Sequence, residues 1–290
     1  CSAATRSSLN NFLAGLAIKR QILTRVNDQA IMLADFPRCG IGWIRFVVAT
    51  VLHYHRTGRF QKLMTQEEMY VYAPTVTGSE RDFRPFSFNG GHYLLKTHTP
   101  YDPRFTRAIV LYRNPYEAIR SVYAHDLMDG VGNLYPRIGR LTAEESYLIH
   151  RAGEYVRFHE SWLSPIRAHP DRYLVIKYEE MLTFTEPVFA KLFEFLWIDI
   201  TDLPPEGLAQ LATMYSRTDC SPPWPGKVDR EEAVRLKARM FEAIQPVMTA
   251  ETLDRIDPAL AARLKDIVAR MDAVRWIPPR IGAEAAMTHA

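Results

Sequence analysis

The amino-acid sequence predicts an α/β fold in which a central parallel β-sheet is flanked by helices on both faces. Short apolar runs, typical of buried parallel strands, recur at residues 31–36, 93–97, 108–112 and 173–177. Longer segments with helical spacing of apolar residues separate these runs, and strands that alternate with helices indicate a parallel sheet. At 290 residues the chain is long enough for one such domain with a large core.

The composition argues against several classes of protein. Hydrophobic residues make up 47% of the chain and charged residues 24%, as in ordinary globular proteins, so extended disorder is not expected. The net charge is only +3 and no block of Lys and Arg occurs, so no nucleic-acid partner is predicted. No apolar run approaches the roughly 18 residues needed to cross a bilayer, so no membrane span is predicted.

The cysteines and histidines do not form a metal-binding pattern. Cys1, Cys39 and Cys220 are far apart and lack C-x-x-C spacing, which argues against a zinc ribbon and against a disulfide scaffold. His53 and His55 are two residues apart on a predicted helix and therefore point in different directions. We therefore predict no metal site and expect a reducing, cytoplasmic location.

We expect one domain over residues 1–290, in three parts. Residues 1–29 contain a predicted packing helix, because apolar residues recur there at near-helical spacing. Residues 30–200 hold the strands and the predicted ligand site, and residues 201–290 are mainly helical. The helices expected in this last part cover residues 205–215, 230–244 and 258–271.

A strand, a loop and a helix between residues 30 and 55 are predicted to bind an anion. The apolar strand carries one Asp near its end, and the loop contains Gly40 and Gly42, which allow unusual backbone dihedrals and close approach to a ligand. A helix is expected to begin near Gly42. The unpaired amides of its first turn and its dipole attract phosphate or sulfate, and Arg38 adds a positive charge beside them.

The same loop excludes two nucleotide-binding motifs and leaves one alternative chemistry open. It lacks the Lys-Ser/Thr pair of a Walker A loop and the G-x-G-x-x-G of a dinucleotide-binding turn. Cys39, Gly42 and Arg45 do fit C-x-x-G-x-x-R, the loop of cysteine-dependent phosphatases, in which a thiolate attacks phosphorus. Arg38 and Phe46 replace the His and the Ser or Thr of its common form. A phosphatase that uses Cys39 and Arg45 is therefore an alternative.

Polar side chains also follow two further strands. Lys96 and His98 lie at the end of the run 93–97, and Arg113 follows the run 108–112. Ligands of open α/β sheets bind at the carboxyl ends of strands, and a His there can take a proton from a hydroxyl near neutral pH. Ser121 lies two helical turns after Arg113, where it can face the same phosphate.

The remaining segments complete the predicted architecture. Residues 57–92 form a long polar, aromatic and turn-rich connection, which we interpret as part of an acceptor-binding surface. Glu179 and Glu180 follow the last strand, but they are adjacent and do not predict a catalytic pair of carboxylates. Further helices are expected at residues 116–128, 144–162 and 188–197.

Three of these segments together resemble the sulfotransferases that use 3′-phosphoadenosine 5′-phosphosulfate (PAPS). FPRCGIGWIRFVV resembles the family's 5′-phosphosulfate loop, commonly P-K-S-G-T-T-W. KTHTP resembles the segment that carries the catalytic His, and RNPYEAIRS resembles the 3′-phosphate motif. YEEM followed by an apolar helix and FEFL also matches, and order and spacing agree over roughly residues 30–200. The resemblance implies a P-loop-like fold of the sulfotransferase type.

The resemblance also implies a role for each matched residue. His98 would be the general base on the acceptor hydroxyl, Lys96 would assist charge at the transferred group, and Arg38 would touch the bridging or sulfuryl oxygens. Trp43 would stack on adenine. Sulfuryl transfer asks mainly for positioning and charge stabilisation, so no metal is implied. The implied cofactor-binding residues are Arg38, Cys39, Gly40, Ile41, Gly42, Trp43, Arg113, Ser121 and Tyr178.

Some positions depart from the family pattern. Cys39, Ile41 and Gly42 stand where the family has Ser, Thr and Thr, and the C-terminal R-K-G…G-x-W-K segment is not clearly present. A non-catalytic protein that binds PAP, the desulfated product, is therefore a further alternative. We expect PAPS as the donor and a small-molecule or carrier-bound hydroxyl as the acceptor, and an oligomer is compatible with the sequence. The candidates for the missing basic residue are Arg217, Lys227, Arg235 and Lys237.

Overall fold

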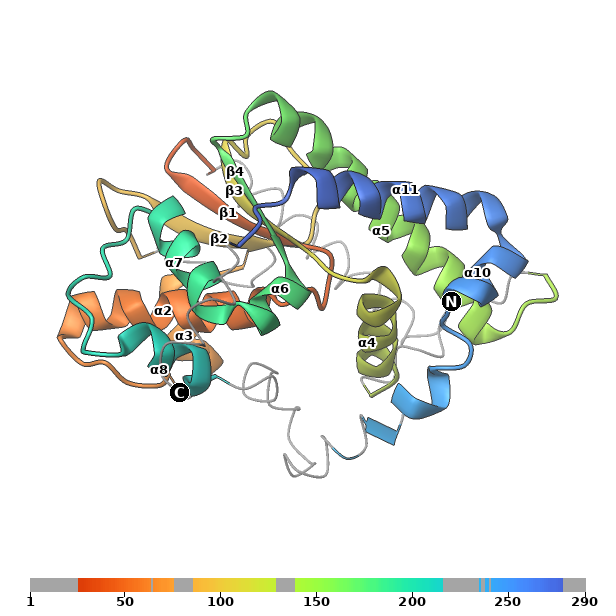
Figure 1. Ribbon diagram of the computed structural model, residues 1–290, viewed down its shortest axis with the longest axis horizontal. Helices are drawn as coiled ribbons and strands as arrows, with labels where there is room; N and C mark the ends of the chain where they lie inside the picture. Colours follow the sequence, from red (N-terminus) through yellow and green to blue (C-terminus); the bar gives the residue numbers. More distant parts are fainter. Residues whose placement is uncertain are drawn as a thin grey trace, which may run out of the picture.

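The sheet of the computed structural model has the predicted parallel architecture (Figure 1). The structure describes residues 26–63, 65–75, 86–128, 139–215, 235, 238–239 and 241–278. Within them, four parallel strands lie in the order β2-β1-β3-β4. The strands are β1 (Ala30–Asp35), β2 (Tyr93–Thr97), β3 (Arg107–Tyr112) and β4 (Tyr173–Lys177).

Helices cover both faces of this sheet, as predicted. The connection from β1 to β2 and the connection from β3 to β4 run in opposite directions along the sheet, so right-handed crossovers place their helices on opposite faces. Accordingly α2 (Ile41–Thr57) and α7 (Thr185–Phe195) lie on one side, and α5 (Ala143–Ala168) and α11 (Pro258–Val274) lie on the other (Figure 1). The other helices are α3 (Gln66–Tyr72), α4 (Pro115–Met128), α6 (Tyr178–Thr183), α8 (Gly207–Met214) and α10 (Ala250–Ile256).

The core lies between the sheet and these two helical layers. Every residue of β1 is buried, as is expected of a strand whose two faces are both covered. On one side α2 contacts β1 and α7 contacts β4, while on the other side α11 packs along α5 and reaches β4. The C-terminal helix is thus attached to the same core as the strands.

Three helices in the described part of the chain were not predicted from the sequence. The connection 57–92 contains a helix, α3, which was not predicted although Thr65 and Glu68 form a capping box at its start. Helices α6 and α10 were also not predicted, because each has only six or seven residues, too few for a clear helical period. The helix expected within residues 1–29 lies outside the described residues except for its end, and so does most of the helix expected at 230–244.

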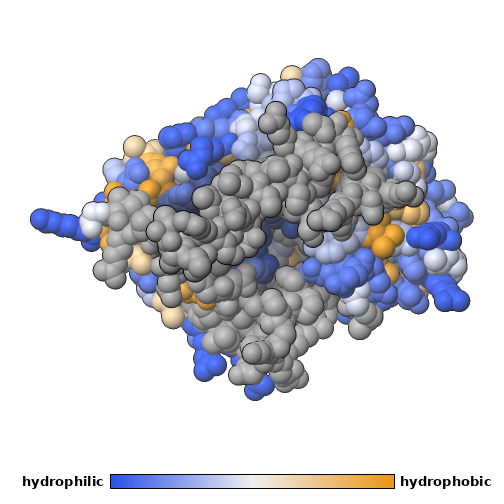
Figure 2. All heavy atoms as spheres, turned by 180° about the vertical axis from the view of Figure 1, so that it is seen from behind, coloured by the Kyte–Doolittle hydropathy of each residue, from blue (hydrophilic) through white to orange (hydrophobic). Residues whose placement is uncertain are grey.

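The described residues that can be seen in Figure 2 are mostly hydrophilic. Figure 2 shows the face opposite to that of Figure 1, where hydrophobic residues form small, separate groups. The large hydrophobic side chains that are exposed include Val71, Leu182, Trp197 and Ile277. Among the described residues, no helix has the length and apolar character that crossing a membrane requires.

Candidate active site

A cavity of about 680 Å³ opens where the carboxyl ends of the strands meet. Its floor includes the ends of β1 and β3, which are neighbours in the sheet but not consecutive in the chain. Ligands of open α/β sheets bind at this kind of switch in strand order. All but one of the predicted site residues line the cavity: Arg38, Gly40, Ile41, Gly42, Trp43, Lys96, His98, Arg113, Ser121 and Tyr178. The exception is Cys39.

The loop after β1 presents free amides to this cavity. Gly40 caps α2 with a φ of 105°, and its carbonyl oxygen accepts hydrogen bonds from the amides of Trp43 and Ile44. Within the described part of the chain, the amides of Gly40, Ile41 and Gly42 have no hydrogen-bond acceptor. The first turn of α2 contains no acidic residue. The helix N-terminus is therefore suited to an anion, as the sequence predicts.

Three of the predicted phosphate-binding residues contact one another. Arg38 Nε donates a hydrogen bond to Ser121 Oγ at 3.2 Å, and Arg113 Nη1 donates one to the Arg38 carbonyl oxygen at 3.2 Å. Ser121 thus faces the strand ends from α4. The guanidinium of Arg113 also lies 4.6 Å from the ring centroid of Tyr178. This contact follows from strand register, because Tyr112 pairs with Lys177 and places Arg113 level with Tyr178.

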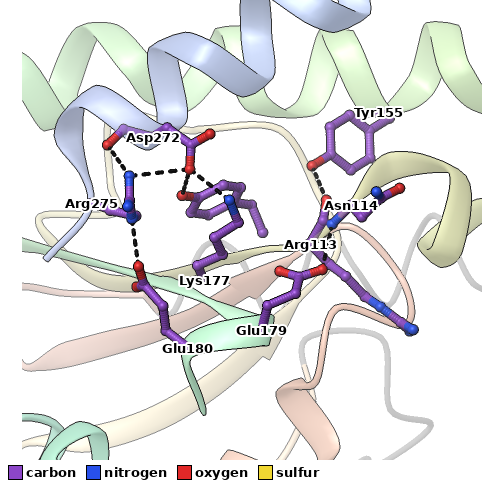
Figure 3. Close-up of polar contacts among 9 residues, drawn as sticks. Arg113, Asn114, Tyr155, Lys177, Glu179, Glu180, Asp272 and Arg275 are labelled. Carbon is purple, nitrogen blue, oxygen red and sulfur yellow. Dashed lines mark hydrogen bonds and ion pairs between the residues drawn. The ribbon is translucent and has the colours of Figure 1, made fainter. Parts of the chain in front are cut away.

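The backbone around Arg113 is fixed from two sides (Figure 3). Tyr155 Oη, from α5, donates to the Arg113 carbonyl oxygen at 2.6 Å. Glu179 Oε1, from α6, accepts the amide hydrogen of Asn114 at 2.9 Å, while the Asn114 side chain accepts the amide of Tyr116 at the start of α4. The Arg113 side chain is therefore aimed at the cavity from a rigid turn.

A second group of polar contacts joins the C-terminal end of α11 to β3, β4 and α6 (Figure 3). Asp272 accepts hydrogen bonds from Tyr112 Oη at 2.7 Å and from Lys177 Nζ at 2.8 Å. Arg275 Nη1 lies 3.2 Å from the same carboxylate, and Arg275 Nε donates to Glu180 Oε1 at 2.6 Å. Asp272 thus links the residues that immediately precede Arg113 and Tyr178.

His98 lies beside the carboxyl end of β1. Ala34 pairs with Thr97, so His98 is level with Asp35. His98 Nδ1 is 3.0 Å from the carbonyl oxygen of Asp35 and 2.7 Å from its Oδ1 atom. Lys96 lines the same cavity, and burial lowers its pKa to about 8, with Arg45 and Arg38 acting in the same direction and Asp35 opposing them. The cavity therefore contains a candidate proton acceptor, His98, together with the cations Lys96, Arg38 and Arg45.

The phosphatase alternative is not supported by this geometry. The Cys39 thiol is fully buried and does not line the cavity, and burial raises its pKa well above the ordinary value, with Asp35 adding to the effect. A nucleophilic thiolate needs the opposite environment. Arg45 Nε donates to the Ala73 carbonyl oxygen at 2.8 Å, and the guanidinium stacks on Tyr70. Cys39 is likewise placed too deep for its side chain to bind a cofactor.

Several cavity residues were not predicted from the sequence. Gln66, Met69 and Tyr70 of α3 were not named individually, but they line the cavity from within the connection 57–92, which was interpreted from the sequence as part of an acceptor-binding surface; the capping box of α3 was the signal that could have located them. Asp126 and Arg151 lie on another wall as an ion pair of 2.7 Å between α4 and α5. No local sequence pattern indicates that these two residues meet.

The basic residue expected from the C-terminal part is not located. Arg217, Lys227 and Lys237 lie outside the described residues, and Arg235 is described as exposed. Among the residues that the structure describes, no cluster of three or more His, Cys, Asp or Glu side chains is arranged to hold a metal ion.

Comparison with known proteins decides the family. The sulfotransferase domain matches residues 28–266, which is most of the chain. The chain belongs to the sulfotransferase family. All the sulfotransferase motifs predicted from the sequence fall within the matched region, and the cavity described above is therefore the candidate active site of a sulfotransferase. No curated protein sequence matches this sulfotransferase.

Solved structures similar to this sulfotransferase include an Arabidopsis thaliana protein named as a steroid sulphotransferase. The two sequences are 17% identical, the match covers 87% of this chain and 84% of that chain, and the TM-score is 0.49. A mouse sulfotransferase complexed with PAP has 17% identity, coverage of 83% and 88%, and a TM-score of 0.43. A retinol dehydratase in complex with androsterone and PAP has 12% identity, coverage of 87% and 82%, and a TM-score of 0.39. Because these TM-scores are below 0.5, membership of the family rests on the domain match.

Proposed function

We propose that this sulfotransferase transfers a sulfuryl group from PAPS to an acceptor hydroxyl, with His98 as the general base. The observation that supports the proposal is that the free amides after β1, the Arg38–Arg113–Ser121 group and His98 line one cavity. The cavity thus offers separate anion-binding groups and a proton acceptor, as transfer between a doubly phosphorylated nucleotide and an alcohol requires.

The donor set fits a nucleotide with phosphates at both ends. The amides of Gly40, Ile41 and Gly42 lie at the positive end of the α2 dipole and are assigned to the 5′-phosphate. Arg113 and Ser121 are assigned to the 3′-phosphate, because they approach Arg38 from the neighbouring strand end and from α4. The half-buried ring of Trp43 lines the same cavity and is assigned to adenine. Tyr178 supports Arg113 from the side.

When bound, PAPS supplies the sulfuryl group: a bond forms from the acceptor oxygen to sulfur, the bond from sulfur to the 5′-phosphate oxygen breaks, and its electron pair stays on PAP. His98 accepts the proton that the hydroxyl loses. Its Nδ1 atom faces the Asp35 carbonyl oxygen, which only accepts hydrogen bonds, so Nδ1 carries the hydrogen and Nε2 is the basic atom. Lys96 and Arg38 stabilise negative charge that develops around the transferred group.

Calorimetric titration with PAP, followed by an acceptor screen with radiolabelled PAPS, tests this proposal. The screen covers a phenol, a steroid alcohol, a long-chain alcohol and a sugar. We expect micromolar or tighter PAP binding and transfer to at least one acceptor. His98→Ala should abolish transfer and leave PAP affinity nearly unchanged, because the imidazole is assigned to the acceptor and not to the nucleotide.

Two results would contradict the proposal. Absence of PAP binding would remove the nucleotide assignment, and transfer that survives in His98→Ala would remove the general base. PAP binding with no transfer to any acceptor would instead identify a non-catalytic PAP-binding protein. The acceptor class is left to the screen, since α3 offers both polar and apolar groups to the cavity through Gln66, Met69 and Tyr70. A cytoplasmic location and an oligomeric state stay predictions.

A further inference from the structure

Asp35 carries a buried carboxylate beside the reaction centre. It is the last residue of β1, and its side chain has no solvent exposure. Among the described residues, neither of its carboxylate oxygens has a hydrogen-bond partner. Burying a charge without hydrogen bonds is strongly unfavourable, and native structures that contain such a group commonly use it at a functional site. Asp35 therefore calls for a functional explanation.

A polar neighbour in direct contact with this carboxylate is His98. The Oδ1 atom lies 2.7 Å from His98 Nδ1, and the backbone carbonyl oxygen of the same Asp35 lies 3.0 Å from it. The Nδ1 hydrogen is aligned with the carbonyl oxygen, which leaves the carboxylate as a negative charge in direct contact with the ring. The carboxylate and the carbonyl oxygen of Asp35 thus both contact His98 Nδ1, which leaves Nε2 on the other side of the ring.

The titratable groups near Asp35 include neutral side chains as well as cations. Cys39 is neutral, because burial raises the pKa of its thiol, and His159 is neutral, because burial lowers its pKa to about 4. Lys96 is a cation whose charged form Asp35 favours against the effect of burial, and the cations Arg38, Arg45 and Arg113 line the same cavity. The carboxylate can therefore influence catalysis through His98 or through Lys96.

We propose that Asp35 is a positioning residue for His98: it holds the ring so that Nε2 stays available to the acceptor, and its charge stabilises the imidazolium formed during transfer. The inference rests on the proposed function, in which His98 is the general base. The proton moves from the acceptor hydroxyl to Nε2, and Asp35 keeps its negative charge and takes up no proton. An Asp that orients and stabilises a catalytic His in this way is known from serine hydrolases on unrelated folds.

The choice of His98 over Lys96 rests on distance and on the alignment of the strands. The pairing of β1 with β2 places His98 directly beside Asp35, whereas Lys96 pairs with Leu33, two residues earlier. Side chains at positions two apart on a strand point to the same face. Lys96 is therefore on the same face of the sheet as His98, but it lies beside Leu33 and not beside Asp35. An effect on Lys96 is the competing explanation, and the experiment below separates the two.

A double-mutant cycle tests the inference, with kcat measured for the acceptor that the screen identifies. The variants are Asp35→Asn, His98→Gln, Lys96→Met, and Asp35→Asn combined with each of the other two. Removing a general base lowers the rate by about 10²- to 10⁴-fold. We expect Asp35→Asn to lower kcat by about tenfold or more, and by no more than His98→Gln does. In the His98→Gln background it should have no further effect.

Each result of the cycle has one meaning. An undiminished effect of Asp35→Asn in the His98→Gln background, or an effect that disappears only in the Lys96→Met background, would overturn the inference. So would wild-type kcat in Asp35→Asn. If His98→Gln itself keeps wild-type kcat, the proposed function fails first, and the inference fails with it. Asp102→Asn, which removes a surface carboxylate paired with Arg104, is the matched control and should keep wild-type kcat.

Two further measurements do not depend on turnover. Nitrogen-15 NMR of the wild-type protein, at a pH where the His98 ring is neutral, should show its single ring hydrogen on Nδ1, and a neutral ring with that hydrogen on Nε2 would overturn the inference whether or not any variant folds. Thermal unfolding of Asp35→Asn should give a melting temperature equal to or above that of the wild type, because the variant removes a buried charge without hydrogen bonds. A large decrease would indicate that Asp35 is a structural residue instead.

Discussion

Gly40 lies directly against the ring of Tyr178. A Cβ atom at Gly40 would be 2.6 Å from Tyr178 Cδ2, a distance that real Cβ atoms essentially never show, and 3.1 Å from Cε2, which is tighter than most real contacts. The ring cannot easily move away, because it is buried and the Arg113 guanidinium also packs against it. The absence of a side chain at Gly40 therefore allows the anion-binding loop and the Arg113 site to come together.

Gly40→Ala is expected to destabilise the protein and weaken PAP binding. Gly58 provides a matched control, because its φ of 69° is also positive but a Cβ there would meet nothing within 4 Å. We expect Gly58→Ala to lower the free energy of unfolding by about 1 to 2 kcal/mol from backbone strain. Gly40→Ala should lose about 1 to 3 kcal/mol more from the clash. Urea unfolding measures both, and equal losses would show that the contact with Tyr178 does not matter.

The Lys96 amine should make PAP binding depend on pH. Burial lowers its pKa to about 8 in the protein alone, and a bound phosphate favours the protonated form. Binding therefore takes up a proton above pH 8, and affinity falls as the pH rises. We expect Kd for PAP to increase by about tenfold between pH 7 and pH 9. Calorimetric titration with PAP at pH 7 and pH 9 checks this prediction. Lys96→Met should bind PAP more weakly, with a Kd that does not change between the two pH values. A pH dependence of Kd that persists in Lys96→Met would show that another group causes it.

Cys39 should behave as an inert core residue. Because burial shields its thiol and raises its pKa, iodoacetamide should modify Cys39 in urea but not in the native protein, as mapped by peptide mass spectrometry. Cys39→Ala should retain sulfuryl transfer. Rapid modification of the native protein, together with hydrolysis of an aryl phosphate that Cys39→Ala abolishes, would restore the phosphatase alternative.

The Asp272 carboxylate should contribute stability that is lost in acid. Burial, the largest single effect, would raise its pKa, but the hydrogen bonds from Lys177 and Tyr112, together with the charges of Lys177 and Arg275, outweigh burial and lower the pKa below the ordinary 3.8. A carboxyl group whose pKa is lowered by folding stabilises the protein above its ordinary pKa, and this contribution disappears as the pH falls through the lowered value. We expect Asp272→Ala to lower the free energy of unfolding at pH 7 by about 1 to 3 kcal/mol.

Urea unfolding of wild type and Asp272→Ala at pH 7 and at pH values below 4 checks this prediction, since the difference between the two proteins should shrink in acid. Asp266, on the same helix, is exposed and lies 3.4 Å from Arg270. Asp266→Ala should therefore change stability by less than about 0.5 kcal/mol. A loss in Asp266→Ala as large as that in Asp272→Ala would show that the contacts with Tyr112 and Lys177 contribute nothing.

The sequence predicted the parts of the site that depend on local pattern. The strands 93–97 and 173–177 match β2 and β4, because short apolar runs between turn residues have few other interpretations. Since the carboxyl ends of parallel strands share one edge, His98 and Arg113 could be assigned to one site before their contacts were known. Their place in the cavity confirms that they share this edge.

Other contacts depend on register and on distant parts of the chain, which the sequence pattern does not determine. The approach of His98 to Asp35 follows from the pairing of Ala34 with Thr97, and a shift by one residue would separate them. Asp272 is 95 residues from Lys177 and 160 from Tyr112, and no motif connects these positions. Residues that act through such long-range contacts could be found only in the folded structure.

Residues that hold the active-site region in place extend beyond the end of the domain match. The match stops at residue 266, yet beyond it Asp272 and Arg275 bond to β4 and α6, and the Trp276 amide donates to the Val175 carbonyl oxygen at 3.0 Å. A protein shortened to residue 266 would retain every cavity residue named above. It would lose the contacts that Asp272 and Arg275 make behind Arg113 and Tyr178. Expression of this enzyme for crystallisation or for directed evolution should therefore keep the chain through at least residue 276.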